Sequence, residues 1–124
     1  MGIEWYVRAD GSGRPTLLEQ KHTNPILLLL PGLGGGSNNL YTHSLAAEAQ
    51  KQGFNCGVVL FRCAENIPIT SCRLTCSSSG EDATAAIDYV FNKYVKDNTT
   101  NENRTRLYAY GTSLGGNLLG LHLI

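Results

Sequence analysis

Charge is scarce in this sequence, and neither sign is in excess. Only 16% of the 124 residues are charged, and ten Lys and Arg balance ten Asp and Glu. A protein that holds nucleic acid by its phosphates needs a surplus of basic residues. We therefore expect no nucleic-acid partner. Apolar residues make up 42% of the chain, which excludes the low hydrophobicity of a disordered protein.

Long hydrophobic runs are absent as well. The longest aliphatic run, Ile26–Leu30, has five residues, whereas a helix needs about 20 apolar residues to cross a bilayer. No transmembrane helix is therefore predicted. The first six residues include Glu4 and lack an apolar core, so they do not predict a secretory signal. Localisation stays open between the cytoplasm and a membrane surface.

Cysteine is sparse, with four residues that allow three disulfide pairings. Because nothing marks the chain as exported, we expect reduced thiols. No C-x-x-C pair occurs, and no histidine lies at zinc-finger spacing. We therefore expect no metal site and no cofactor. The four residues are Cys56, Cys63, Cys72 and Cys76.

What the sequence does contain is an alternation of strands and helices. Short apolar runs between turn residues predict buried parallel strands, and apolar stripes at helical spacing predict helices. The predicted strands are 26–30, 56–61 and 107–110, and the predicted helices are 39–52, 79–94 and 114–124, with Ser79 as a capping residue. This order predicts an α/β fold with a parallel sheet and helices on both faces. Residues 1–24 are expected to form a polar leading segment with a strand near residues 4–7.

A tight turn is predicted between the last strand and the last helix. The segment from Gly111 to Gly115 has the form G-x-S-x-G, in which a strained turn leaves no room for side chains at the two glycines. The turn presents the hydroxyl of Ser113 above the sheet. The N–H of Leu114, at the start of the helix, points toward developing negative charge. The motif therefore predicts a serine nucleophile.

A second glycine-rich loop, Pro31-Gly32-Leu33-Gly34-Gly35, follows the first strong strand. In α/β-hydrolases the second oxyanion donor comes from a loop after an upstream strand, so Leu33 is the expected donor. Two alternatives stay open. The loop also begins a G-x-G dinucleotide-binding motif, although Ser37 stands where its third glycine belongs. The serine turn could also be retained for folding alone in a non-catalytic binding or structural module.

The two loops together resemble the α/β-hydrolase superfamily, in its YheT-like branch with the ABHD1, ABHD2 and ABHD3 types. The resemblance covers residues 25–124, and its most specific part is P-G-L-x-G combined with G-T-S-L-G-G-N. It implies a serine esterase or lipase, or an acyltransferase, acting on acyl esters such as acylglycerols or phospholipids. It assigns Ser113 as nucleophile and Leu33 and Leu114 as backbone oxyanion donors. Many members associate with membranes, so it also implies peripheral membrane association.

The partners of the serine in a catalytic triad are not expected among these residues. In this fold the acid and the histidine follow the nucleophile in the chain. The eleven residues after Ser113 contain His122 and no acid, and a histidine nine positions along the same helix cannot fold back. His22 and His43 are expected to be ordinary surface or core-edge histidines. Residues 25–124 are therefore predicted to be the N-terminal part of a larger hydrolase domain, with little turnover alone.

Overall fold

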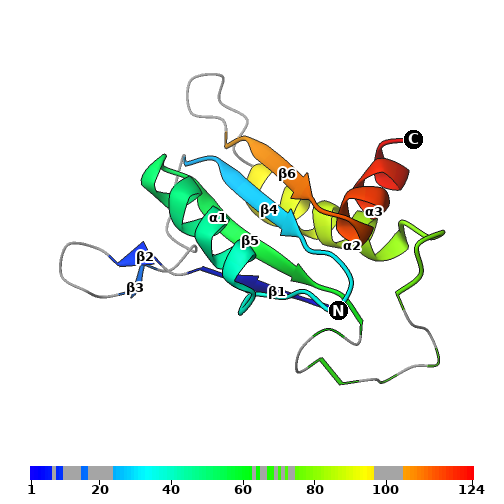
Figure 1. Cartoon of the computed structure of the whole chain (residues 1–124). Coiled ribbons are helices and arrows are strands. Elements are labelled where there is room, and N and C mark those ends of the chain that lie inside the picture. Colours follow the sequence, from blue (N-terminus) through cyan, green and yellow to red (C-terminus); the bar gives the residue numbers. More distant parts are fainter. Residues whose placement is uncertain are drawn as a thin grey trace.

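A four-stranded sheet with helices on both faces forms the centre of the protein (Figure 1). The computed structural model describes residues 1–6, 8–9, 15–16, 24–62, 64, 67–68, 70, 72, 75–96 and 105–124. The strands of this sheet are β1 (Gly2–Trp5), β4 (Ile26–Leu30), β5 (Asn55–Leu60) and β6 (Leu107–Gly111). The helices are α1 (Leu40–Lys51), α2 (Glu81–Val90) and α3 (Leu114–Leu123), and α2 continues into a π-helical turn, η1 (Phe91–Val95). A separate two-stranded sheet joins β2 (Arg8–Ala9) to β3 (Pro15–Thr16).

The order of strands in the main sheet is β1-β5-β4-β6. β4 pairs in parallel with β5 on one side and with β6 on the other, so that Leu28 lies opposite both Gly57 and Ala109. β1 pairs with β5 in the antiparallel direction. The fold therefore belongs to the α/β class predicted, with one antiparallel strand added. Because β4, β5 and β6 run the same way, their carboxyl ends meet at one edge of the sheet, here called the carboxyl edge.

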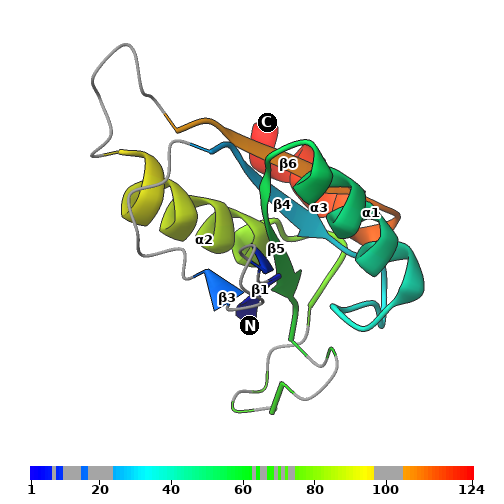
Figure 2. The same cartoon turned by 90° about the vertical axis from the view of Figure 1, so that its left-hand side faces the viewer.

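The two faces of the sheet are covered by different helices (Figure 2). Side chains of successive strand residues point to opposite faces, so each strand contributes to two apolar clusters. Leu28 and Val59 pack toward α2 and α3, together with Ala86 and Leu118. On the other face, Leu29, Val58 and Leu60 pack toward Ala46 of α1. Both faces of β5 are buried, as a parallel sheet between helix layers requires.

The helices and parallel strands agree with the sequence-based predictions to within a few residues, whereas the first strand is displaced. It was expected near residues 4–7 and spans Gly2–Trp5, while residue 7 lies outside the described residues. The displacement has a packing reason. The ring of Trp5 lies over Gly57, where a Cβ atom would come within 3.0 Å of it, and meets the ring of Tyr94 edge-on at 5.5 Å. Packing of this partly buried ring against the core accompanies the pairing of Trp5 with Gly57.

The start of α2 also differs from its prediction. Ser79 was expected to cap the helix, but Gly80 occupies the N-cap position and provides no side-chain cap. Ser79 Oγ accepts from the N–H of Glu81 at 3.5 Å, which is a long hydrogen bond. Gly80 stands here because α3 passes closely: an added Cβ would lie 3.1 Å from Leu121 Cβ.

The structure also locates several residues named from composition. Cys56 is buried, and Cys72 and Cys76 are exposed; all three are free thiols, while Cys63 lies outside the described residues. Within the described ranges, no helix combines the length and apolar content that a membrane span needs. No group of three His, Cys, Asp or Glu residues in the same ranges is placed to hold a metal ion.

Candidate active site

Ser113 occupies a sharp turn between β6 and α3 at the carboxyl edge. Its backbone has φ 52° and ψ −118°, and it is the one non-glycine residue with positive φ in the part of the chain that the structure describes. Such a conformation costs about 1–3 kcal/mol in a residue with a side chain, and strain of this kind concentrates at functional sites. The side chain is exposed. The turn therefore presents a hydroxyl group to solvent at a sheet edge.

The two glycines of the motif are required by close backbone contacts. A Cβ atom on Gly115 would lie 1.9 Å from the carbonyl oxygen of Leu30, at the end of β4. A Cβ on Gly111 would lie 2.6 Å from the carbonyl oxygen of Gly115. Neither distance permits a side chain, because real Cβ atoms do not approach other atoms so closely. The start of α3 is thus pressed against the ends of β4 and β6, and only glycine fits on either side of the serine.

The loop after β4, residues 31–39, lies against this turn. A Cβ on Gly32 would come within 3.3 Å of Ser113 Cβ and 3.8 Å of Ser113 Oγ. The N–H of Thr112 donates to the carbonyl of Leu30 at 3.1 Å, which ties the turn to β4. The parallel register, with Leu30 opposite Gly111, brings the two loops together. We call residues 31–39 the glycine loop.

The glycine loop folds back on itself beside the serine. The N–H of Gly35 donates to the carbonyl of Gly32 at 3.0 Å, and Gly34 adopts φ +70°, a conformation natural to glycine. Between them Leu33 is 86% exposed, so its side chain projects away from the protein. This turn lies where the sequence predicts the second oxyanion donor.

Two backbone N–H groups near Ser113 have no partner within the described chain. The N–H groups of Leu33 and Leu114 donate none of the hydrogen bonds found among the described residues. Leu114 is the first residue of α3, where N–H groups are left free and the helix dipole is positive. Together the Ser113 turn and the glycine loop therefore offer a hydroxyl group, a helix start and a loop N–H that is unpaired among the described residues, close to one edge of the sheet.

Neither described histidine is hydrogen-bonded to Ser113 as a general base would be. His122, on α3, lies with Nδ1 2.9 Å from Thr84 Oγ1 on α2. His43 is exposed on α1, and its ring meets that of Tyr6 at 5.4 Å. His22 lies outside the described residues. Among the described hydrogen bonds, none joins either histidine to Ser113.

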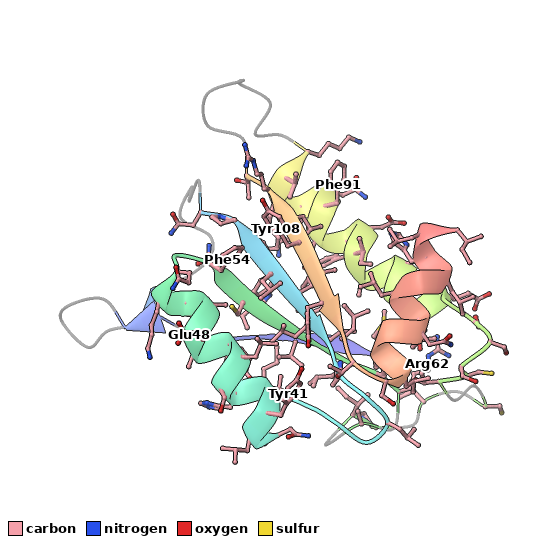
Figure 3. All side chains as sticks on the ribbon, turned by 45° about the horizontal axis from the view of Figure 1, so that its top comes forward. Tyr41, Glu48, Phe54, Arg62, Phe91 and Tyr108 are labelled. Atoms are coloured by element: carbon pink, nitrogen blue, oxygen red, sulfur yellow. The ribbon has the colours of Figure 1, made fainter. Side chains whose placement is uncertain are left out.

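Two polar pairs at the carboxyl edge were not predicted from the sequence. The hydroxyls of Tyr41 on α1 and Tyr110 on β6 lie 2.9 Å apart, and this hydrogen bond raises the pKa of Tyr41. Arg62, which follows β5, forms an ion pair with Asp82 of α2, with a nitrogen-oxygen distance of 3.0 Å. Figure 3 shows Tyr41 and Arg62 near the ends of the parallel strands. Because side chains alternate along a strand, Tyr110 is expected on the face of the sheet that α1 covers. Nothing in the sequence, however, identifies Tyr41 as its hydrogen-bond partner.

Comparison with known proteins gives two distant matches, whereas no family model and no solved structure matches significantly. The chain is 31% identical over 100 residues, 81% of its length, to "Embryogenesis-associated protein EMB8" of Picea glauca. It is 27% identical over 103 residues, 82% of its length, to "Abhydrolase domain-containing protein 2" of Drosophila melanogaster. The alignments cover 20% and 24% of these proteins. The chain thus spans between a fifth and a quarter of the curated relatives it matches.

Proposed function

We propose that Ser113 is the nucleophile of a serine ester hydrolase, starting from the distant similarity of this chain to an abhydrolase domain-containing protein. The observation that supports this most strongly is the backbone of Ser113, strained at φ 52° between glycines that admit no side chain. If the turn served folding alone, glycine at position 113 would adopt the same positive φ without strain. Strain retained at an exposed hydroxyl indicates a use for that hydroxyl.

In the proposed reaction, Ser113 Oγ attacks the carbonyl carbon of an acyl ester. The N–H groups of Leu33 and Leu114 donate to the oxygen that becomes negative. A histidine takes the proton of the hydroxyl and an acid orients that histidine; both come from the remaining length of the whole protein. The ester C–O bond then breaks, and the histidine returns the proton to the leaving alcohol. Water, or a second alcohol, attacks the acyl-enzyme and releases the acid or a new ester.

We further propose that the substrate is a lipid ester, such as an acylglycerol or a phospholipid. Leu33, within the glycine loop, is 86% exposed, and Leu40, the first residue of α1, is 81% exposed. Exposed aliphatic side chains beside a site favour an apolar ligand or a membrane surface. The exposed leucines support the proposal of peripheral membrane association. The motifs of the two loops support the proposal of the YheT-like branch of lipases. In this proposal residues 25–124 are the N-terminal part of the hydrolase domain.

Labelling of the whole protein with a fluorophosphonate tests the assignment. We expect one covalent adduct, located by peptide mass spectrometry on Ser113, in the native protein and not after heat denaturation. Ser113→Ala abolishes the adduct, whereas the control Ser44→Ala, at an exposed position of α1, leaves it unchanged. A folded whole protein that takes no label, or takes it on another residue, contradicts the proposal. The 124-residue chain alone should react about 10⁴–10⁶ times more slowly if no base assists the serine.

A further inference from the structure

The far end of the glycine loop is attached to the first strand of the sheet. Ser37 is buried, with 4% of its surface exposed. Its hydroxyl donates a hydrogen bond to Glu4 Oε2, and its carbonyl accepts one from the hydroxyl of Tyr6 at 2.6 Å. The partners are 33 and 31 positions away in the sequence. A single loop residue is therefore held at two points by the chain at and after β1.

Both partners are fixed by the sheet rather than by the loop. Glu4 lies opposite Val58 in the antiparallel pair, and Val58 faces α1. The N–H of Tyr6 donates to the carbonyl of Cys56 at 2.9 Å, and Gln50 of α1 donates to the carbonyl of Tyr6 at 3.1 Å. Two residues of the leading segment thus form a rigid mount on the same face as the glycine loop.

The glycine loop needs such a mount because of its composition. Gly32, Gly34, Gly35 and Gly36 allow many backbone conformations, and fixing each costs more entropy than for other residues. The β4 end of the loop is set by contact with the Ser113 turn. Ser37 sets the other end, so the position of the Leu33 N–H between them depends on both. A displacement of about 1 Å in a catalytic group can cost 10²-fold in rate.

We propose that Glu4 and Tyr6 are positioning residues, which hold Ser37 so that the N–H of Leu33 stays directed at the oxyanion. This inference rests on the proposed function of Ser113. In this proposal Glu4 and Tyr6 contact Ser37 and have no contact with the substrate. Their effect passes through Ser37 and the glycine loop, so their removal should slow the reaction of the serine without unfolding the sheet.

The test compares Glu4→Ala, Glu4→Gln and Tyr6→Phe in the whole protein. We expect the fluorophosphonate labelling rate of Ser113 to fall about 10- to 100-fold in Glu4→Ala and about 10-fold in Tyr6→Phe. Glu4→Gln should recover most of the rate, because its amide oxygen also accepts from Ser37. Matched controls are Glu48→Ala, on the exposed side of α1, and Tyr108→Phe, at an exposed tyrosine of β6. Both should label at the rate of the unchanged protein.

Amide hydrogen exchange separates this inference from the proposed function. In Glu4→Ala and Tyr6→Phe, exchange should accelerate in residues 32–37 while β4 and β5 keep their protection. Unchanged exchange and labelling in both variants would overturn the inference, and so would loss of protection through the whole sheet, which indicates a purely structural role. If Ser113 takes no label in the unchanged protein, the proposed function fails. In that case, faster exchange confined to the glycine loop still supports the inference that Glu4 and Tyr6 hold this loop in place.

Discussion

At the scale of single residues, Ser113 combines an unfavourable backbone with neighbours that cannot accommodate a side chain. Its φ of 52° is imposed from outside, because α3 starts so close to β4 that Gly115 lies against the carbonyl of Leu30. The surrounding contacts therefore determine the conformation, and Ser113 itself is exposed, unlike the two glycines, which admit no side chain. This arrangement separates the stability of the turn from its chemistry.

Replacing Ser113 by glycine should stabilise the fold relative to replacement by alanine. Glycine adopts positive φ freely, whereas alanine keeps the strain of the serine. We expect Ser113→Gly to have a free energy of unfolding about 1 kcal/mol higher than Ser113→Ala, after the larger entropy of glycine in the unfolded chain is counted. Urea denaturation of the two variants measures this difference. Equal stabilities would show that the turn is not strained.

Adding a single methyl group at Gly115 should have a much larger effect. The new Cβ would lie 1.9 Å from the Leu30 carbonyl oxygen, so α3 and β4 must separate. We expect Gly115→Ala to lower the free energy of unfolding by about 3 kcal/mol or more. Gly120→Ala is the control on the same helix, because nothing lies within 4 Å of its Cβ position. It should raise stability by about 0.5–1 kcal/mol through helix propensity.

The thiol of Cys76 should react at a lower pH than an ordinary cysteine. Its sulfur lies 2.9 Å from Ser78 Oγ, and this hydrogen bond lowers the pKa of Cys76. A lowered pKa leaves more thiolate at any pH below the ordinary value. Iodoacetamide at pH 7, read by peptide mapping, should therefore modify Cys76 faster than the exposed Cys72. The Ser78→Ala variant should remove the difference, and a rate at Cys76 that is the same in both proteins would contradict the role of the hydrogen bond.

At the scale of elements, periodicity predicts what is regular and misses what depends on distant contacts. The apolar stripe from Ala83 to Tyr94 predicted one continuous helix, but its last turn is the π-helix η1, with the N–H of Lys96 donating to the carbonyl of Phe91 at 2.9 Å. The wider turn places Val95 in the interior and accompanies the contact of Tyr94 with Trp5. The two-residue strands β2 and β3 are too short to show a period.

The candidate site divides in the same way between local and distant information. Ser113 and its two glycines follow from one five-residue pattern, although only the close contact of Gly111 is local, while that of Gly115 is with Leu30 at the end of β4. The pairs of Tyr41 with Tyr110 and Glu4 with Ser37 join residues 69 and 33 positions apart. Their distances depend on strand order and register. No spacing in the sequence encodes these, so such pairs become visible only in the folded protein.

The ion pair between Arg62 and Asp82 should anchor α2 to the end of β5. The Asp82 side chain is 12% exposed and that of Arg62 31% exposed, so removing one partner leaves a charge that water reaches poorly. We expect Asp82→Ala to lower the free energy of unfolding by about 1–3 kcal/mol, which is less than for a fully buried pair. Asp88→Ala, on the exposed side of the same helix, is the control and should change it by less than about 0.5 kcal/mol. Equal effects in urea denaturation would show that the pair is not an anchor.

At the scale of the whole molecule, β6 is an edge strand of the sheet among the described residues. In the described part of the chain β6 pairs only with β4, and its other edge borders a groove of about 850 Å³. The groove is lined mainly by apolar side chains of α2, η1, β6 and α3, among them Ile87, Leu107 and Leu119. An unpaired strand beside an apolar groove is a template for pairing with another strand.

The 124-residue chain should therefore self-associate as its concentration rises. Sedimentation velocity should show dimers or larger species that Ala109→Lys reduces, because this residue lies on β6 and lines the groove and a charge there opposes strand pairing. The control Ala85→Lys makes the same change at an exposed position of α2 outside the groove. A chain that stays monomeric, or an equal effect of both variants, would contradict association through β6.

The reversed direction of β1 has a practical consequence for experiments. Gly2 lies opposite Leu60, at the end of β5, so Met1 lies at the same carboxyl edge of the sheet as Ser113 (Figure 1). An affinity tag joined to Met1 would therefore lie at the carboxyl edge, with two strands between β1 and β6 in the order of the sheet. A small fluorophore on the terminal amine would instead act as a sensor, because a bound ligand or a lipid vesicle approaching that edge would change its emission.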